Sequence, residues 1–270
     1  MTAAIRAEFR KFFTTRMWWG MAIAIFFLGV ALAVVFGFLL TSEAGRRAGG
    51  AGGGGLSGTP EQIANSVYTS GLGVGYLLTL TIGIMQIGSE YRHKTISSTF
   101  LGTPKRGVVM GAKVVALLVL GAAYGLLSLI GSVAAGAIVL KARGYDPFPT
   151  SGVFRTLALA LLVLGLWALI GLGAGILIPN QVAALLIAVG VAWIVEPLIV
   201  FGLGFWPWGR EHLAPYFPSS ATNAMVNGVS QGGANAVHLL QWWGGALVLA
   251  LYAAVLAGIG SWRTVRSDIS

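Results

Sequence analysis

Long stretches without a charged residue constrain this chain more than any other feature. Segment 17–40 contains no Asp, Glu, Lys or Arg, and as a helix it would cover about 36 Å, enough to cross the hydrocarbon of a bilayer. Over all 270 residues, 56% are hydrophobic and 9% are charged, which is far too apolar for a soluble domain of this size. The sequence therefore predicts an all-α integral membrane protein.

Apolar segments of this kind recur along the chain and are separated by polar, turn-forming loops. Segment 41–60 is Gly-rich and predicts a flexible external loop. Segment 201–235 is broken by prolines and predicts an external cap with a short re-entrant or surface helix rather than a span. We expect six transmembrane helices, at 17–40, 66–88, 114–140, 156–178, 181–200 and 236–260.

The first 16 residues predict an amphipathic helix that lies along the membrane interface. Its apolar residues recur at i, i+4, i+7 and i+8, and its basic residues lie elsewhere around the helix. A signal peptide is the alternative, but the apolar run that follows is too long and no small-residue cleavage site ends it. The apolar face comprises Ile5, Phe9, Phe12 and Phe13.

Basic residues predict which ends of the spans lie in the cytoplasm. With both termini inside, eleven Lys and Arg residues fall on the inner segments and six on the outer ones, as expected from the positive-inside rule. Arg is more frequent than Lys, and Ala and Gly are abundant, which favours a bacterial source. We therefore expect a multi-pass protein of the bacterial cytoplasmic membrane.

Residues 88–113 form a strongly basic island between two uncharged spans. Ser89 is placed to cap a short cytoplasmic helix, which Gly102 would end, and Pro104 suits the first turn of the next helix. The island has two interpretations. It is either a docking surface for a soluble partner or an ordinary cytoplasmic loop that only fixes the topology.

Glu196 is an ionisable residue inside a predicted span, in the sequence GVAWIVEPLIV, and Pro197 follows it directly. A charged group at this depth is costly and by default suggests function. Three interpretations stay open: a structural carboxylate that caps backbone donors, a residue on the substrate path or gate, and a proton-coupling site. The absence of a second acid or a basic partner within a span argues against a proton relay.

Motifs for catalysis are absent from the sequence. There is no cysteine, no Walker lysine motif, no HExxH and no GxSxG, and the three histidines are too scattered to suggest a metal site. The glycines at 49–58 are not followed by Lys-Ser or Lys-Thr, so they do not predict a phosphate-binding loop. We expect no enzyme activity and no cofactor in this chain.

The basic island resembles the cytoplasmic loop of ABC-2 type transporter permeases. In that family a G-x-E-x-R-x-x-T stretch leads through T-F-L to P-x-R and a Lys that opens the third span. The likeness extends over the whole chain, from the amphipathic N-terminal helix to the Glu-Pro of the fifth span. The matching positions here are Gly88, Glu90, Arg92, Thr95, Thr99, Phe100, Leu101, Pro104, Arg106 and Lys113.

This resemblance implies a type V exporter-like permease that pairs with a second permease chain, identical or not. A separate ATP-binding subunit would hold ATP and Mg and would dock on the coupling loop, residues 89–113. The hinge into the third span would comprise Pro104, Arg106 and Lys113. The docking residues on the coupling helix would be Glu90, Tyr91, Arg92, Thr95, Ile96, Thr99 and Phe100.

Two alternatives come from other functional classes. One is a membrane anchor or regulatory subunit that recruits a cytoplasmic protein through the same loop and transports nothing. The other is an ion-coupled carrier that uses Glu196. The resemblance favours an exporter of hydrophobic or amphipathic molecules over both.

Overall fold

The computed structural model describes residues 1–42, 58–93, 95, 106–226 and 237–266. Within these ranges the chain forms helices and no strand, which confirms the all-α prediction. Six helical segments are long and apolar enough to cross a membrane, as predicted. They are Met17–Thr41, Pro60–Arg92, Gly107–Ala142, Gly152–Leu177, Gln181–Gly204 and Trp242–Gly260.

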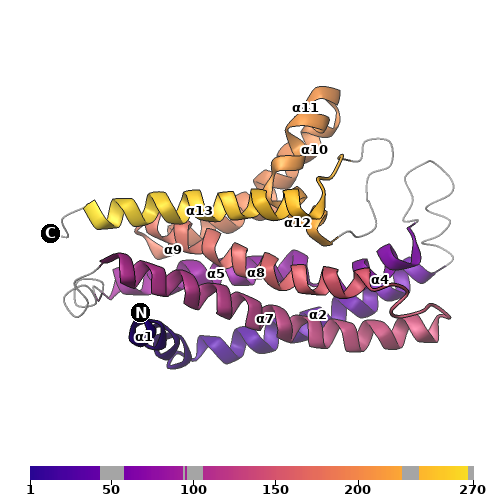
Figure 1. The fold of residues 1–270 in the computed structure, drawn as a ribbon, viewed down its shortest axis with the longest axis horizontal. Helices are drawn as coiled ribbons and strands as arrows, with labels where there is room; N and C mark the ends of the chain where they lie inside the picture. Colours follow the sequence, from indigo (N-terminus) through magenta and orange to yellow (C-terminus); the bar gives the residue numbers. More distant parts are fainter. Residues whose placement is uncertain (43–57, 94, 96–105, 227–236, 267–270) are drawn as a thin grey trace.

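Helix α8 (Gly152–Leu177) is the centre of the bundle and the most buried of the six. It packs along α5 (Leu72–Arg92), α7 (Arg106–Ala142) and α13 (Trp242–Arg266). Helix α2 (Met17–Thr41) packs along α7 on the outer side of the bundle (Figure 1). The core of the protein therefore lies around α8.

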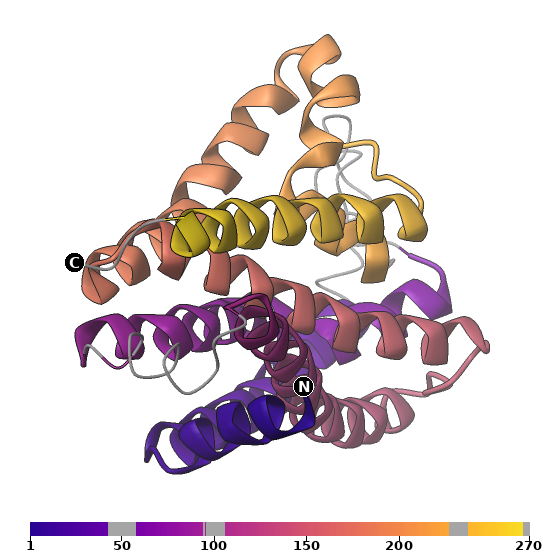
Figure 2. The same cartoon turned by 60° about the vertical axis from the view of Figure 1, so that its left-hand side comes forward.

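The fifth span is irregular and leaves the body of the bundle. It consists of α9 (Gln181–Gly190), a π-helical turn (Val191–Val195) and α10 (Glu196–Gly204). Figure 2 shows α10 and the short α11 (Pro207–His212) rising away from the other helices. A 3-10 turn (Ala214–Tyr216) then leads back to α12 (Pro218–Val226), a short helix buried against α13.

Several helices begin or end away from the predicted span limits. The second span starts at Pro60 rather than 66, because Thr59 and Gln62 form a capping box at the start of α4 (Pro60–Thr69). Helix α7 starts at Arg106 instead of 114. The last span starts at Trp242 rather than 236, since residues 237–241 are not helical.

Glycines allow α5 and α8 to approach more closely than larger residues would permit. A Cβ atom on Gly83 would overlap the carbonyl oxygen of Ala168, and one on Gly171 would overlap that of Leu80. A Cβ on Gly121 of α7 would likewise lie only 2.7 Å from the Cα of Gly165. These close contacts fix the positions of α5 and α7 around α8.

We expect Gly83→Ala and Gly171→Ala to push α5 and α8 apart and to destabilise the protein by about 1–3 kcal/mol. Gly73→Ala is the matched control on α5, because no atom lies within 4 Å of a Cβ placed there. Thermal melting in detergent measures both effects. Equal melting temperatures for all three variants would contradict the close packing.

Candidate functional site

The N-terminal helix α1 (Thr2–Phe13) lies against the ends of α5 and α7. Phe12 is fully buried and makes an edge-on contact with the ring of Tyr124, at 6.0 Å between centroids. The hydroxyl of Tyr124 in turn donates a hydrogen bond to the carbonyl oxygen of Trp18, at 2.7 Å. These contacts dock α1 on the bundle through Phe12.

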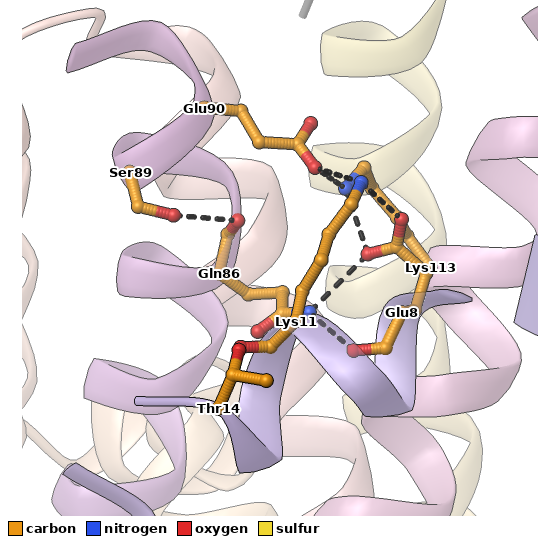
Figure 3. Close-up of polar contacts among 7 residues, drawn as sticks. All are labelled: Glu8, Lys11, Thr14, Gln86, Ser89, Glu90 and Lys113. Carbon is orange, nitrogen blue, oxygen red and sulfur yellow. Dashed lines mark hydrogen bonds and ion pairs between the residues drawn. The ribbon is translucent and has the colours of Figure 1, made fainter. Parts of the chain in front are cut away.

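Five polar residues meet where these three helices join, and we call them the charge cluster: Glu8, Lys11, Gln86, Glu90 and Lys113 (Figure 3). Lys113 Nζ donates to Glu8 Oε2 at 2.8 Å and to Glu90 Oε1 at 2.7 Å. Lys11 Nζ donates to Glu8 Oε1 at 2.9 Å and to Glu90 Oε1 at 2.6 Å. Gln86 Nε2 completes the cluster by donating to Glu8 Oε2 at 3.2 Å.

The charges of this cluster cancel, which makes its burial tolerable. Glu8, Glu90 and Lys113 are 2%, 4% and 1% exposed, so each ion has lost nearly all of its water. Removing one partner from such a site leaves an uncompensated buried charge and is strongly destabilising. The cluster therefore ties α1 to α5 and α7 as one unit.

The sequence analysis did not predict Glu8, Lys11 or Gln86 as residues of this site, and the most buried of the three is Glu8. It lies one turn before Phe12, on the face of α1 that docks on the bundle. The sequence indicated this buried role by placing an acidic residue on the apolar side of a helix whose other charged residues are basic. Its partners Glu90 and Lys113 were predicted as site residues, but in other roles. Glu90 was predicted to dock the partner, and Lys113 to form part of the hinge.

The predicted docking residues divide into two groups. Glu90 points inward to the charge cluster and Tyr91 is half-buried, whereas Arg92 and Thr95 are exposed, as is His93, which was not among the predicted docking residues. Arg106 is the first residue of α7, and Lys113 lies further along the same continuous helix. The other predicted site residues of this loop, Ile96, Thr99, Phe100 and Pro104, lie outside the described residues.

The prediction that Ser89 caps a separate short helix is wrong. Helix α5 continues through Ser89 to Arg92, and the Ser89 hydroxyl donates to the carbonyl oxygen of Gln86 within the same helix. The ion pairs of Glu90 hold this last turn of α5 against α1 and α7. The helix therefore extends one turn beyond the predicted span.

Glu196 makes a buried polar contact at a different place in the bundle. Its carboxylate is 5% exposed, and the backbone N–H of Ser219 donates to its Oε1 at 2.5 Å. Ser219 is in the first turn of α12, so Glu196 caps that helix, as the structural interpretation predicted. A second bond holds α12 on α8, from Trp167 Nε1 to the hydroxyl of Thr222 at 3.0 Å.

We expect the charge cluster to behave as one energetic unit. Glu8→Gln and Lys113→Met should each cost about 3–5 kcal/mol, because each leaves an excess buried charge. The double variant should lose less than the sum, since the pair of Lys11 and Glu90 then remains neutral. Chemical unfolding in detergent measures this coupling.

Arg10→Gln serves as the control for this comparison of single and double variants, because Arg10 is exposed on the same helix. Its effect should stay within about 0.5 kcal/mol. Strict additivity of Glu8→Gln and Lys113→Met would contradict the proposed pairing.

The cluster also predicts a pH dependence. Burial alone would raise the pKa of the Glu8 carboxyl, but Lys113 and Lys11 outweigh it and hold that pKa below its usual 4.5. Glu8 therefore contributes stability above 4.5, which is lost as the pH falls through the lowered pKa. The difference in melting temperature between wild type and Glu8→Gln should be large at neutral pH and shrink in acid. A difference that persists in strong acid would argue against this role.

On the basic side, burial alone would lower the pKa of Lys11, but Glu90 and Glu8 raise it above its usual 10.5. The contribution of Lys11 is present below 10.5 and is lost only as the pH rises through the raised pKa. Both groups therefore keep their native charges throughout the neutral range.

Glu196→Ala should destabilise the protein by about 1–2 kcal/mol, because the N–H of Ser219 then loses its acceptor. Glu196→Gln keeps an acceptor oxygen at this position and should cost less. Melting temperatures of the two variants test the order. The capping role fails if alanine is tolerated as well as glutamine.

The described residues contain no group of three His, Cys, Asp or Glu side chains that could hold a metal ion. A family model described as ABC-2 family transporter protein matches residues 2–269, which is nearly the whole chain and includes every span and the charge cluster. Among curated proteins, no sequence matches the chain.

Proposed function

Because the chain belongs to the ABC-2 transporter family, we propose that it forms half of a dimeric pathway that exports a hydrophobic or amphipathic molecule. Membership makes it the permease subunit of an ABC transporter, a membrane component of transport rather than a catalytic enzyme. In the proposal, a separate ATP-binding subunit docks on the coupling loop at 89–113 and supplies the ATP and Mg.

The charge cluster is the observation that carries this proposal. Glu90 lies in the last turn of α5 and Lys113 in the first turns of α7, so the two ends of the coupling loop are joined by an ion pair of 2.7 Å. Glu8 and Lys11 extend the same pairing to α1. Movement of the loop by a docked subunit would therefore move three helices together.

The surface next to the cluster supports a contact with a partner. Arg92, His93 and Thr95 follow Glu90 closely in the chain and are exposed. The end of α5, where Arg92 lies, is at the end of the molecule that also holds α1 and the last turns of α13 (Figure 1). Buried Glu90 positions these residues, and the exposed ones make the contact.

The fifth span supports the dimer and the class of substrate. Little of Gln181–Gly204 is buried within one chain, and large apolar side chains such as Trp193, Leu198 and Phe201 are exposed along it. A second permease chain placed against this span would cover those side chains and line the pathway with apolar surface. Such a surface suits a hydrophobic or amphipathic substrate.

The proposed location is the cytoplasmic membrane of a bacterium, with both termini inside. Exposed basic residues near the cluster, such as Arg92, agree with a cytoplasmic position for this end of the bundle. The end of the bundle that holds α4 then faces outward, together with Lys141 and Arg143.

The test is reconstitution of the permease with the ATP-binding subunit that co-purifies with it. We expect Arg92→Ala to reduce co-purification several-fold. Glu8→Gln should retain binding but weaken the stimulation of ATP hydrolysis by the permease, because the loop is then tied to α1 only through the pair of Lys11 and Glu90. Lys141→Ala is the control, since Lys141 is exposed at the opposite end of α7.

Undiminished binding of the ATP-binding subunit by Arg92→Ala would contradict docking at this face. Binding and ATP hydrolysis without export from vesicles would favour the membrane anchor. Export that continues without ATP and follows an ion gradient would favour the carrier that uses Glu196.

A further inference from the structure

An apolar groove of about 450 Å³ lies between the first turns of α7 and the middle of α13, with α8 as its floor. Helix α13 lines it with four alanines and Gly258. Helix α7 contributes Met110, Gly111 and Val114, and α8 contributes Leu166 and Leu169. Among the residues that the structure describes, neither a charged side chain nor a hydroxyl group lines the groove.

The groove exists because α7 and α13 each pack along α8 but barely touch one another. Small side chains on α13 leave the space between them unfilled. A Cβ on Gly258 would meet no atom within 4 Å, whereas one on the nearby Gly260 would press against Ile176 at 2.9 Å. The face of α13 at Gly258 is therefore open, whereas the face at Gly260 packs on α8.

A molecule that binds in this groove must be apolar and flexible. Both helices belong to membrane-crossing segments, so the groove is filled from the lipid phase and not from water. From Ala250 to Gly258 the groove runs along α13 for about 12 Å. Its volume falls within the roughly 300–1,000 Å³ of ordinary ligand sites, yet its described lining offers no polar side chain to orient a ring system. A methylene chain fits this shape and chemistry.

The charge at the nearby helix ends indicates the head group of that chain. Helix α1 begins beside Gly111 of the groove and exposes Arg6 and Arg10, and Arg92 is exposed at the end of α5. Under the proposed function this end is cytoplasmic, where basic residues attract anionic lipid head groups. We infer that the groove binds one acyl chain of an anionic phospholipid from the cytoplasmic leaflet.

This lipid would pack on the part of α7 that carries the charge cluster. Met110 and Gly111 lie within one turn of Lys113, whose side chain leaves α7 on another face. A Cβ on Gly111 would lie 3.2 Å from the side chain of Met1, so the groove also reaches the start of α1. The bound chain therefore supports the same two helices that Glu8 and Lys113 join.

The experiment is native mass spectrometry of the delipidated permease, titrated with phosphatidylglycerol or with phosphatidylcholine of the same chains. Gly258→Leu and Ala254→Leu fill the groove from α13. We expect each variant to bind phosphatidylglycerol about tenfold more weakly, because methylene contacts are lost. Gly20→Leu is the control, since Gly20 has equally open surroundings on α2 and does not line the groove.

Two results would overturn the inference. Wild-type affinity for phosphatidylglycerol in the groove variants would show that the lipid binds elsewhere. Equal affinity of the wild type for both lipids would overturn the anionic assignment. Size-exclusion chromatography confirms folding, and Ala254→Leu carries the test if Gly258→Leu does not fold. Because the ATP-binding subunit is absent, these results do not depend on the coupling experiment.

Discussion

A neutral set of buried charges determines how this end of the protein is built. Glu8, Glu90 and Lys113 are buried together, and Lys11, whose side chain is 39% exposed, supplies the second positive charge from the edge of the site. The two carboxylates could not stay buried without the lysines. Helix α1 was predicted to lie along the membrane interface. Its basic residues Arg6 and Arg10 stay exposed, while Glu8 pairs with Lys113 and holds the helix against the bundle.

That site depends on close helix packing elsewhere. Ion pairs of 2.6–2.9 Å leave little room for movement between α1, α5 and α7. The glycine contacts between α5 and α8, and between Gly121 and Gly165, hold the helix axes near enough for the side chains to reach one another. Apolar packing within the spans and ionic pairing at their ends thus act on the same helices.

Much of the fold could be predicted, because the bilayer allows so few structures. Uncharged runs indicated the six spans, and the basic island carried the family resemblance. The site itself was harder, because charged residues such as Glu90 and Lys113 suggest a solvated loop when taken alone. Their burial depends on Glu8, which lies 105 residues before Lys113, and one sequence does not reveal that pairing. The capping role of Glu196 was among the predictions, but its partner Ser219 became visible only in the fold.

The direction of the Glu196 side chain depends on the number of residues in the helical turn before it. The π-helical turn Val191–Val195 holds one residue more than an α-helical turn, which rotates everything after it by about 100°. Without that extra residue, Glu196 would take the direction that Val195 has now, and Val195 is exposed. The number of residues in this turn therefore determines the direction of the Glu196 side chain, whichever apolar residues the turn contains.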